Sequence, residues 1–348
     1  MMIDGHLDLF SGIGGFSLGL KQAGIEPKWL GFSDIDKYAN KTFKRRFPDA
    51  KKLGSITDVS YESLRGKRID LLTGGFPCQA FSLAGARKGF NDTRGTLFFE
   101  IERILKDYIR NEKPISCILL ENVKGLLNHD NGQTFATIYG ILSNLNYTLE
   151  CQLVNTKWWL PQNRERIYIF GRYNGNPSGR KVFPVGANDK ETNPKEINIV
   201  GHSGSGGERG FIYSTDGIMA TLSATDYKQP KQIKVYSTQL RNPNRPSLTK
   251  VCDCGSEKLY KKCCGADGGV GILAKNDGTI YCMDTANAQA IEFKSRIRKL
   301  TPMECERLQG FPDGWTDGQS DTQRYKQCGN AVSVPVTEAI FRSIYNND

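Results

Sequence analysis

Short apolar runs alternate with stretches of helical periodicity along the first half of the chain. Residues 69–72, interrupted only by Asp70, and residues 118–120 and 167–170 are apolar runs of the length that buried strands have. Residues 97–109 and 135–144 carry the spacing of helices. A regular alternation of strands and helices is typical of a sheet of parallel strands with helices on both faces. The pattern therefore predicts a doubly wound, Rossmann-like α/β domain.

The texture of the sequence changes after about residue 171. Gly, Asn, Ser, Thr, Pro and Lys become frequent and helical periodicity nearly vanishes until about residue 295, as expected of a small, loop-rich domain. We predict a first domain at residues 1–171, an inserted small domain at residues 172–295, and a segment at residues 296–348 that completes the first domain.

Helical periodicity returns after Leu300. Thr301, Pro302 and Glu304 have the spacing of a capping box with proline at the first helical position, which predicts a helix over residues 301–308. A last helix is expected near residues 336–345, where it would pack back on the first domain.

One cysteine stands on a rigid turn directly after the apolar run 69–72. The turn reads Gly-Gly-Phe-Pro-Cys over residues 74–78, and a turn in this place faces the crevice at the carboxyl edge of a parallel sheet. Pro77 restricts the backbone beside the thiol, so the sulfur of Cys78 is held in one orientation. Taken alone, Cys78 fits a catalytic nucleophile and a buried structural cysteine about equally well.

A second glycine-rich turn opens the chain. Residues 8–16 read as a strand, a turn containing Gly12, Gly14 and Gly15, and the start of a helix, with Asp34 roughly 20 residues further on. Glycines let a backbone approach a ligand closely, and a carboxylate at the end of the next strand accepts hydrogen bonds from ribose hydroxyls. The motif indicates a nucleotide or nucleoside site, although nicotinamide dehydrogenases have a similar glycine-rich turn and acidic residue.

Charged residues follow two further apolar runs. Glu121 and Asn122 end the run that begins at Ile118, and Arg164 and Arg166 lead into the run at 167–170. Taken singly, Glu121 is a plausible salt-bridge partner and the arginines a solvated strand entrance. Together with Cys78, they place a thiol, an acid and two cations at one edge of the predicted sheet.

Composition and charge favour a polyanionic partner. The 348 residues include 47 Lys and Arg against 37 Asp and Glu, a formal net charge of +10, which favours nucleic acid. No apolar run is long enough to cross a membrane and residues 1–4 do not resemble a secretion signal, so we predict a cytoplasmic protein with no membrane partner. The 10 cysteines are expected to be free or metal-bound rather than disulfide-bonded.

The blocks occur in an order that resembles the DNA (cytosine-5) methyltransferase family of bacteria and phages. The similarity covers nearly the whole chain, in blocks at residues 8–20, 74–82, 94–100, 121–125, 162–171, 298–312 and 327–332. The resemblance implies the doubly wound fold of methyltransferases dependent on S-adenosylmethionine, with an inserted target recognition domain. It also implies transfer of the methyl group of S-adenosylmethionine to C5 of cytosine in duplex DNA, leaving S-adenosylhomocysteine.

The same resemblance implies catalytic roles for residues at the sheet edge. Cys78, after Pro77, adds to cytosine C6 and makes C5 nucleophilic. Glu121 provides a proton or a strong hydrogen bond at N3. Arg166 holds the cytosine O2, and Arg164 and Asn122 support the pocket.

Cofactor contacts are implied in the same way. The residues concerned are Phe10, Gly12, Ile13, Gly14, Gly15, Asp34, Ile35, Ile56, Leu97, Asn330 and Val332. Two positions depart from the family's pattern, because Asp34 stands where most relatives have Glu, and Ser55 stands where an Asp usually contacts the adenine amino group. The adenine contact is therefore left unassigned.

The family's way of acting on DNA leads to further expectations. The target cytosine would be flipped out of the duplex, with residues 84–94 closing over it as a lid. We expect a monomer that associates with the nucleoid through DNA, accompanied by a cognate restriction endonuclease or acting alone in a phage or host. An RNA-directed relative shares the chemistry, and a non-catalytic DNA-binding relative would lack Cys78, Glu121 or Arg166, all of which are present.

A cluster of cysteines lies within the predicted recognition domain. Cys252, Cys254, Cys263 and Cys264 form two close pairs separated by a short basic segment, and four thiolates suit one tetrahedral Zn²⁺. The block resembles the short zinc motif at the C terminus of the SecA translocase. We predict a structural zinc knuckle over residues 252–265, with a pair of reduced loop cysteines as the alternative.

Overall fold

The structure is a computed structural model of the 348-residue chain and divides into two compact units. It describes residues 1–77, 97–175, 180–186, 199–202, 211–214, 219–224, 226, 228, 231–238 and 293–345. The first unit comprises residues 1–198, 216–231 and 300–348, and the second comprises residues 199–215 and 232–299.

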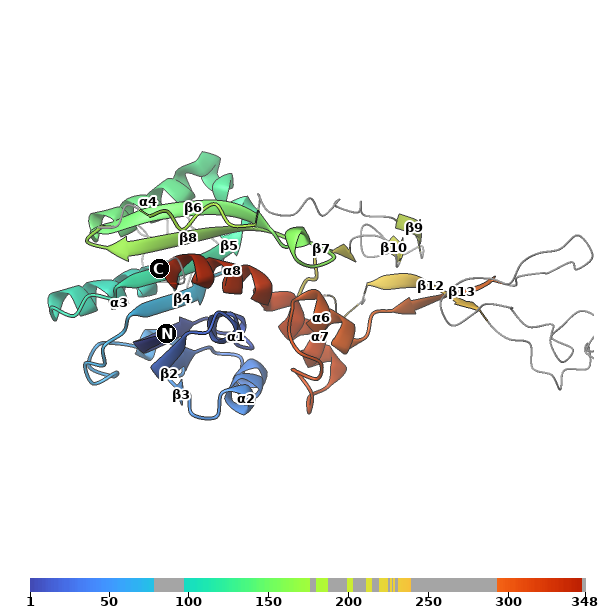
Figure 1. Cartoon of the computed structure of the whole chain (residues 1–348), viewed down its shortest axis with the longest axis horizontal. Helices are drawn as coiled ribbons and strands as arrows, with labels where there is room; N and C mark the ends of the chain where they lie inside the picture. Colours follow the sequence, from blue (N-terminus) through green and yellow to red (C-terminus); the bar gives the residue numbers. More distant parts are fainter. Residues whose placement is uncertain are drawn as a thin grey trace, which may run out of the picture. The chain divides into compact units, whose positions relative to one another are not determined.

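The first unit is built on a seven-stranded sheet with the order β3-β2-β1-β4-β5-β8-β6 (Figure 1). The strands are β1 (Met2–Leu9), β2 (Glu26–Ser33), β3 (Lys51–Lys52), β4 (Leu71–Gly75), β5 (Cys117–Val123), β6 (Tyr147–Asn155) and β8 (Glu165–Tyr173). The first five pair in parallel, whereas β8 is antiparallel to both β5 and β6.

The direction of β8 is the main departure from the predicted parallel sheet. Only residues 156–164 join β6 to β8, and a connection this short links antiparallel neighbours because a parallel pair needs a crossover of a dozen or more residues. As a result, the start of β8 lies at the same edge as the ends of β4 and β5, with Val123 opposite Arg166 and Gly75 opposite Glu121.

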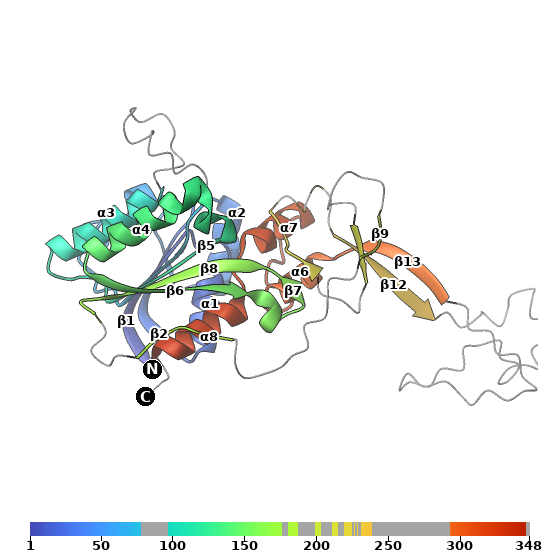
Figure 2. The same cartoon turned by 90° about the horizontal axis from the view of Figure 1, so that it is seen from above.

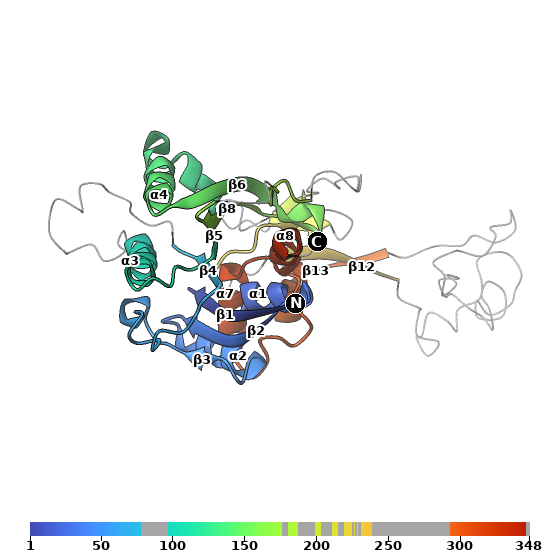
Figure 3. The ribbon, with the colours of Figure 1, turned by 60° about the vertical axis from the view of Figure 1, so that its left-hand side comes forward.

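Helices cover both faces of this sheet, as predicted (Figures 2 and 3). Their bounds are α1 (Gly15–Gln22), α2 (Lys37–Arg46), α3 (Leu97–Arg110), α4 (Gln133–Asn144), α6 (Pro302–Leu308), α7 (Asp321–Asn330) and α8 (Val334–Tyr345), with short 3₁₀ helices η1 (Ile56–Asp58), η2 (Lys124–Leu127), η3 (His129–Gly132) and η4 (Thr156–Trp158). Helices α3 and α4 bury their apolar sides against Ile118 and Leu120 of β5, whereas α1 and α8 pack on the face that carries Leu119. This alternation along one strand is what a sheet covered on both faces requires.

The two helices predicted near the C-terminal end are confirmed. Helix α6 begins with a capping box in which the Thr301 hydroxyl accepts the Glu304 N–H and the Glu304 carboxylate accepts the Thr301 N–H. Helix α8 packs against α1 in the first unit. In the part of the chain that the structure describes, no helix has the length and apolarity needed to span a membrane.

The second unit contains a four-stranded sheet with the order β13-β12-β10-β9. The strands are β9 (Ile199–His202), β10 (Phe211–Ser214), β12 (Gln232–Thr238) and β13 (Phe293–Lys299). Between β10 and β12 the chain returns to the first unit, where β11 (Met219–Ala220) pairs in parallel with β7 (Gln162–Asn163). Compactness thus assigns residues 216–231 to the first unit, while the functional boundaries predicted at residues 172 and 295 stay a prediction.

Candidate active site

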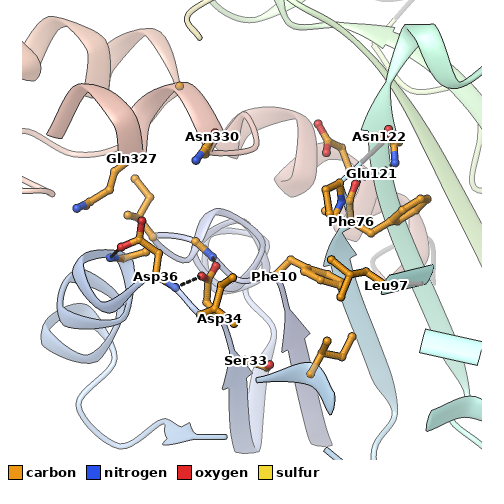
Figure 4. Close-up of a pocket in the computed structure, with 18 of the residues that line it drawn as sticks. Phe10, Ser33, Asp34, Asp36, Phe76, Leu97, Glu121, Asn122, Gln327 and Asn330 are labelled. Carbon is orange, nitrogen blue, oxygen red and sulfur yellow. Dashed lines mark hydrogen bonds between the residues drawn. The ribbon is translucent and has the colours of Figure 1, made fainter. Parts of the chain in front are cut away.

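A cavity of about 420 Å³ opens at the carboxyl edge of the large sheet. Its walls come from the ends of β1, β2, β4 and β5, from the start of β8 and from the end of α7 (Figure 4). The predicted cofactor residues that line it are Phe10, Gly12, Ile13, Asp34, Ile35, Ile56, Leu97 and Asn330. The predicted catalytic residues that line it are Pro77, Glu121, Asn122, Arg164 and Arg166. One cavity therefore joins both predicted sets.

Three of the predicted cofactor residues lie behind the wall of the cavity. Gly14, Gly15 and Val332 are not among the residues that line it. Gly15 packs directly on Val332, whose Cγ2 would lie only 2.5 Å from a Cβ at Gly15. These residues support the wall by close packing, and their direct contact with a cofactor stays a prediction.

The glycine turn after β1 has a backbone path that few side chains tolerate. Phe10, Gly12 and Gly14 have φ angles of 51°, 53° and 89°, in the left-handed region that glycine adopts without a steric cost. A Cβ at Gly14 would lie 2.7 Å from the Phe47 ring, whereas a Cβ at Gly12 would meet nothing within 4 Å. Gly12 thus presents bare backbone at the cavity, where a ligand can approach closely.

Asp34 receives hydrogen bonds from two backbone groups at the end of β2. Its Oδ2 accepts the Gly12 N–H at 2.8 Å and its Oδ1 accepts the Asp36 N–H at 2.8 Å (Figure 4). Burial raises the pKa of the Asp34 carboxyl, and the two backbone N–H donors oppose that rise. Each oxygen keeps a lone pair for a hydroxyl donor.

The apolar side of the cavity lies next to Asp34. Ile35 is 85% exposed at the cavity, and Phe10, Ile56 and Leu97 complete an apolar surface. Ser55 also lines the cavity, where its hydroxyl accepts a hydrogen bond from the Thr57 hydroxyl at 2.8 Å. Ser55 is the N-cap residue of η1.

Glu121 and Arg166 face each other from neighbouring antiparallel strands. The Arg166 Nε lies 3.1 Å from the Glu121 Oε1, and both side chains are mostly buried. The Arg166 Nη1 also donates to the Glu165 carbonyl at 2.7 Å. The predicted acid and its neighbouring cation therefore share one corner of the cavity.

Asn122 fixes the backbone that leads to the predicted nucleophile. Its Nδ2 donates to the Phe76 carbonyl at 2.9 Å, and its Oδ1 accepts the Val123 N–H at 2.8 Å. Phe76 is buried and Pro77 is exposed at the cavity. Cys78 and the predicted lid at residues 84–94 lie outside the described residues.

The sequence did not point to an ion pair at the cavity. The Lys326 Nζ on α7 donates to the Asp36 Oδ2 at 2.7 Å, and both residues line the cavity. The two positions are 290 residues apart. Asp36 is the N-cap of α2, a role that the sequence could have indicated, but a single lysine in a polar helix carries no sequence signal.

None of the described cysteines lines the cavity, so none competes with Cys78 for a nucleophilic role there. Cys117, Cys305 and Cys328 are buried, and burial raises the pKa of the Cys117 thiol to about 11. Among the residues that the structure describes, no group of three or more His, Cys, Asp or Glu side chains is placed to hold a metal ion. The cysteines of the predicted zinc knuckle, at positions 252, 254, 263 and 264, lie outside the described residues.

Comparison with known proteins agrees with the arrangement of the cavity. A model of the family described as C-5 cytosine-specific DNA methylase matches residues 5–346. Type II methyltransferase M.SsoII of Shigella sonnei is 37% identical over 350 residues, covering 97% of this chain and 79% of that protein. Type II methyltransferase M.HpaII of Haemophilus parainfluenzae is 35% identical over 354 residues, covering 97% and 88%.

The fold has a counterpart among solved structures. The crystal structure of S. pombe Dnmt2 methyltransferase aligns with a TM-score of 0.66 at 19% identity, over 98% of both chains. At that identity the likeness shows the fold alone, a methyltransferase α/β fold with helices on both faces of a mostly parallel sheet. Because the family match spans nearly the whole sequence, this chain belongs to the C-5 cytosine-specific DNA methylase family and is a DNA methyltransferase that acts at C5 of cytosine.

Proposed function

We propose that the first unit methylates a cytosine turned out of duplex DNA, with S-adenosylmethionine in the cavity and Cys78 as the nucleophile. The observation that carries this proposal is the continuity of the cavity, which runs from Gly12 and Asp34 to Glu121 and Arg166. A methyl donor and a base that receives the methyl group must meet in one space, and this lining provides a distinct end for each.

The residues at the first end fit S-adenosylmethionine, the cofactor of this family. The open backbone at Gly12 leaves room for the ligand, and the Asp34 oxygens have lone pairs for a ribose diol. The exposed Ile35, with Phe10 and Leu97, offers an apolar surface to a flat base. When bound, the cofactor supplies an electrophilic methyl group on a sulfonium.

The residues at the second end would activate the cytosine. The Cys78 thiolate would form a bond from Sγ to C6, which pushes the C5–C6 π electrons toward C5 and makes that carbon nucleophilic. The methyl group that the cofactor supplies would then bond to C5, leaving S-adenosylhomocysteine. Glu121 protonates or hydrogen-bonds N3 as charge moves into the ring, and Arg166 holds O2 and stays paired with Glu121. The C5 proton would then pass to a base, for which water is our proposal, the Sγ–C6 bond would break to return the thiolate, and N3 would return its proton to Glu121.

The chain's charge and organisation support a duplex DNA substrate. The target base lies inside the stack, so the enzyme must flip it into the cavity. A net charge of +10 favours phosphate binding, and we assign sequence recognition to the inserted region. The RNA-directed alternative is not favoured, because the matching family is a DNA methylase family.

The biological setting is a further part of the proposal. The type II names of the relatives support a role as the modification partner of a restriction endonuclease. We propose a monomer that acts on the nucleoid in the cytoplasm. The zinc knuckle over residues 252–265 rests on cysteine spacing alone, and elemental analysis of protein purified without added metal would detect about one zinc per chain if it forms.

Sequencing of plasmid DNA tests activity and target site together. The protein is expressed in a host that lacks cytosine methylation, and 5-methylcytosine is mapped on the recovered plasmid. We expect modification at one recurrent sequence in the wild type and none with Cys78→Ser. Cys151→Ser is the matched control, because Cys151 is an exposed cysteine on β6, and it should methylate like the wild type. An unmodified plasmid from well-expressed wild type would overturn the proposal.

Covalent trapping tests the mechanism separately. A duplex with 5-fluorocytosine at the mapped site cannot lose its C5 substituent, so the Sγ–C6 bond should persist. We expect a complex that survives denaturant with the wild type and Cys151→Ser but not with Cys78→Ser. Absence of the wild-type complex, with methylation of the normal site intact, would refute the nucleophilic role of Cys78.

A further inference from the structure

The chain between two strands of the second unit runs through the first unit. Strand β10 ends at Ser214 and β12 begins at Gln232, and residues 216–231 between them belong to the first unit. We call residues 219–224 the anchor segment. Its two ends continue into the inserted region, so the segment connects that region covalently to the unit that holds the cavity.

The anchor segment is fixed to the strand that precedes β8. Met219 pairs with Gln162, and the Met219 N–H donates to the Pro161 carbonyl at 2.8 Å. The Thr221 hydroxyl donates to the Asn163 carbonyl. Leu222 is 2% exposed, so the segment is part of the interior rather than a surface linker.

Arg164 joins the anchor segment to the wall of the cavity. Arg164 is 3% exposed, and its Nη1 donates to the Leu222 carbonyl at 3.3 Å. Its Nη2 donates to the Ala331 carbonyl at 2.8 Å. A planar guanidinium holds two acceptors in fixed geometry, which an ammonium cannot do.

The second carbonyl belongs to a segment that shapes the cavity. We call residues 327–331 the rim segment, since Gln327, Gly329 and Asn330 line the cavity. The anchor segment packs directly on it, because a Cβ at Gly329 would lie 2.2 Å from the Ser223 carbonyl carbon and oxygen. A displacement of the anchor segment therefore acts on the rim both through backbone packing and through Arg164.

We propose that Arg164 is a positioning residue that couples DNA binding by the inserted region to cofactor binding in the cavity, by holding the anchor and rim segments in one arrangement. The inference rests on the proposed function, because it takes the inserted region as the DNA reader. Coupling between two ligands is a free energy that each exerts on the other's affinity. A buried guanidinium that binds two chain segments transmits this coupling free energy, because packed segments shift together rather than deform.

Calorimetric titration of S-adenosylhomocysteine measures this coupling. The Kd is determined alone and in the presence of a duplex carrying the site mapped by plasmid sequencing. We expect DNA to tighten binding by the wild type on the order of tenfold. In Arg164→Lys, which keeps the charge but cannot hold both carbonyls, the ratio of the two Kd values should fall below about twofold. Gly329→Ala, which separates the two segments without changing Arg164, should lower the ratio as well.

Gly140→Ala provides the matched control for the glycine variant. Gly140 is in α4, and a Cβ there meets nothing within 4 Å, so its ratio should equal that of the wild type. Thermal unfolding and S-adenosylhomocysteine binding without DNA establish that each variant is folded.

Hydrogen exchange gives a readout without DNA. Binding of S-adenosylhomocysteine should slow amide exchange over residues 219–224 in the wild type and in Gly140→Ala, and less so in Arg164→Lys and Gly329→Ala. A wild type that methylates DNA but shows equal Kd values with and without the duplex would overturn the coupling and leave the proposed function standing. A folded Arg164→Lys variant with the wild-type ratio and wild-type exchange would overturn the role of Arg164.

Discussion

Glu121 and Arg166 form an ion pair without forming a hydrogen bond. The Arg166 Nε lies 3.1 Å from the Glu121 Oε1, yet that oxygen has no hydrogen-bond partner in the described part of the protein. Its contact with Arg166 is therefore electrostatic, and the oxygen can still accept a hydrogen bond. The oxygen itself is buried, so a ring nitrogen in the cavity would meet the carboxyl group through its other oxygen.

Glu121→Gln should abolish most of the activity while leaving the cavity intact. Glutamine keeps the shape of the side chain but cannot transfer a proton, so we expect the single-turnover rate of methyl transfer to fall by about 10²- to 10⁴-fold. The Kd for S-adenosylhomocysteine should stay within about twofold of the wild-type value, because Asp34 and Gly12 are unchanged. A rate within threefold of the wild type would rule out the proposed role at N3.

The positions of three strands and the residues at their ends could be predicted from the sequence. Apolar runs predicted β4, β5 and β8. The residues that follow β4 and β5 and those at the start of β8 all lie at the carboxyl edge of the large sheet, where they line the cavity. The antiparallel direction of β8 could not be predicted, because β7 and η4 make the connection from β6 short in a way that periodicity does not reveal.

The contacts made through backbone carbonyls also left no signal in the sequence. Arg164 binds the carbonyls of Leu222 and Ala331, and any residue type has a carbonyl. Composition placed residues 219–224 in the loop-rich region. Composition cannot show that a short segment of such a region returns to the first unit.

Ser55→Asp should tighten cofactor binding. An aspartate can take over the N-cap position of η1 that Ser55 holds, and its carboxylate reaches further into the cavity, where it can accept a hydrogen bond from an adenine amino group. We expect the Kd for S-adenosylhomocysteine to fall by about threefold to tenfold, the effect of one added hydrogen bond. Ser55→Ala serves as the control and should lower stability by about 1 kcal/mol with little change in affinity. Unchanged or weaker binding by Ser55→Asp would contradict the prediction that an aspartate here reaches the adenine amino group.

Gly19→Ala should destabilise the packing of α1 on α8. A Cβ at Gly19 would lie 2.1 Å from the Thr337 Oγ1 and 2.9 Å from the Glu338 backbone nitrogen, so the two helices must move apart. We expect a loss of about 1–3 kcal/mol in the free energy of unfolding, although alanine favours a helix by about 1 kcal/mol over glycine. Urea denaturation measures the change. The Gly140→Ala side chain would enter open space, so this variant should be neutral or stabilising. Equal stabilities of the two variants would show that α1 and α8 move apart at Gly19 without a loss of stability.

Asp8 is a fully buried carboxyl that supports the glycine turn from below. Its Oδ2 accepts the Ser17 hydroxyl at 2.6 Å and its Oδ1 accepts the Thr73 hydroxyl at 3.0 Å. It thereby ties β1 to α1, whose N-cap Gly14 has no side chain to offer, and to β4. Burial raises the pKa of Asp8 to about 7, and the two hydroxyl donors oppose that rise.

This raised pKa predicts a pH dependence of stability with a definite sign. The pKa of Asp8 in the unfolded chain is about 3.9, so between roughly pH 4 and 7 the folded protein binds a proton that the unfolded chain does not. The contribution of Asp8 is thus fully present below pH 4 and is lost as the pH rises through 7. His6 acts in the opposite direction, because burial lowers its pKa to about 3 and its contribution is lost as the pH falls from about 6.5.

Asp8→Asn should show this contribution, because His6 is present in both proteins and asparagine keeps an oxygen acceptor for the Thr73 hydroxyl that both residues contact. Asparagine does not titrate, so its free energy of unfolding relative to the wild type should rise steadily between pH 4 and 7 and stay constant above that range. Urea denaturation at a series of pH values gives the two curves. If the Asp8→Asn curve runs parallel to the wild-type curve from pH 4 to 8, the buried carboxyl does not take up a proton on folding. Asp8 would then not be a source of the pH dependence of stability.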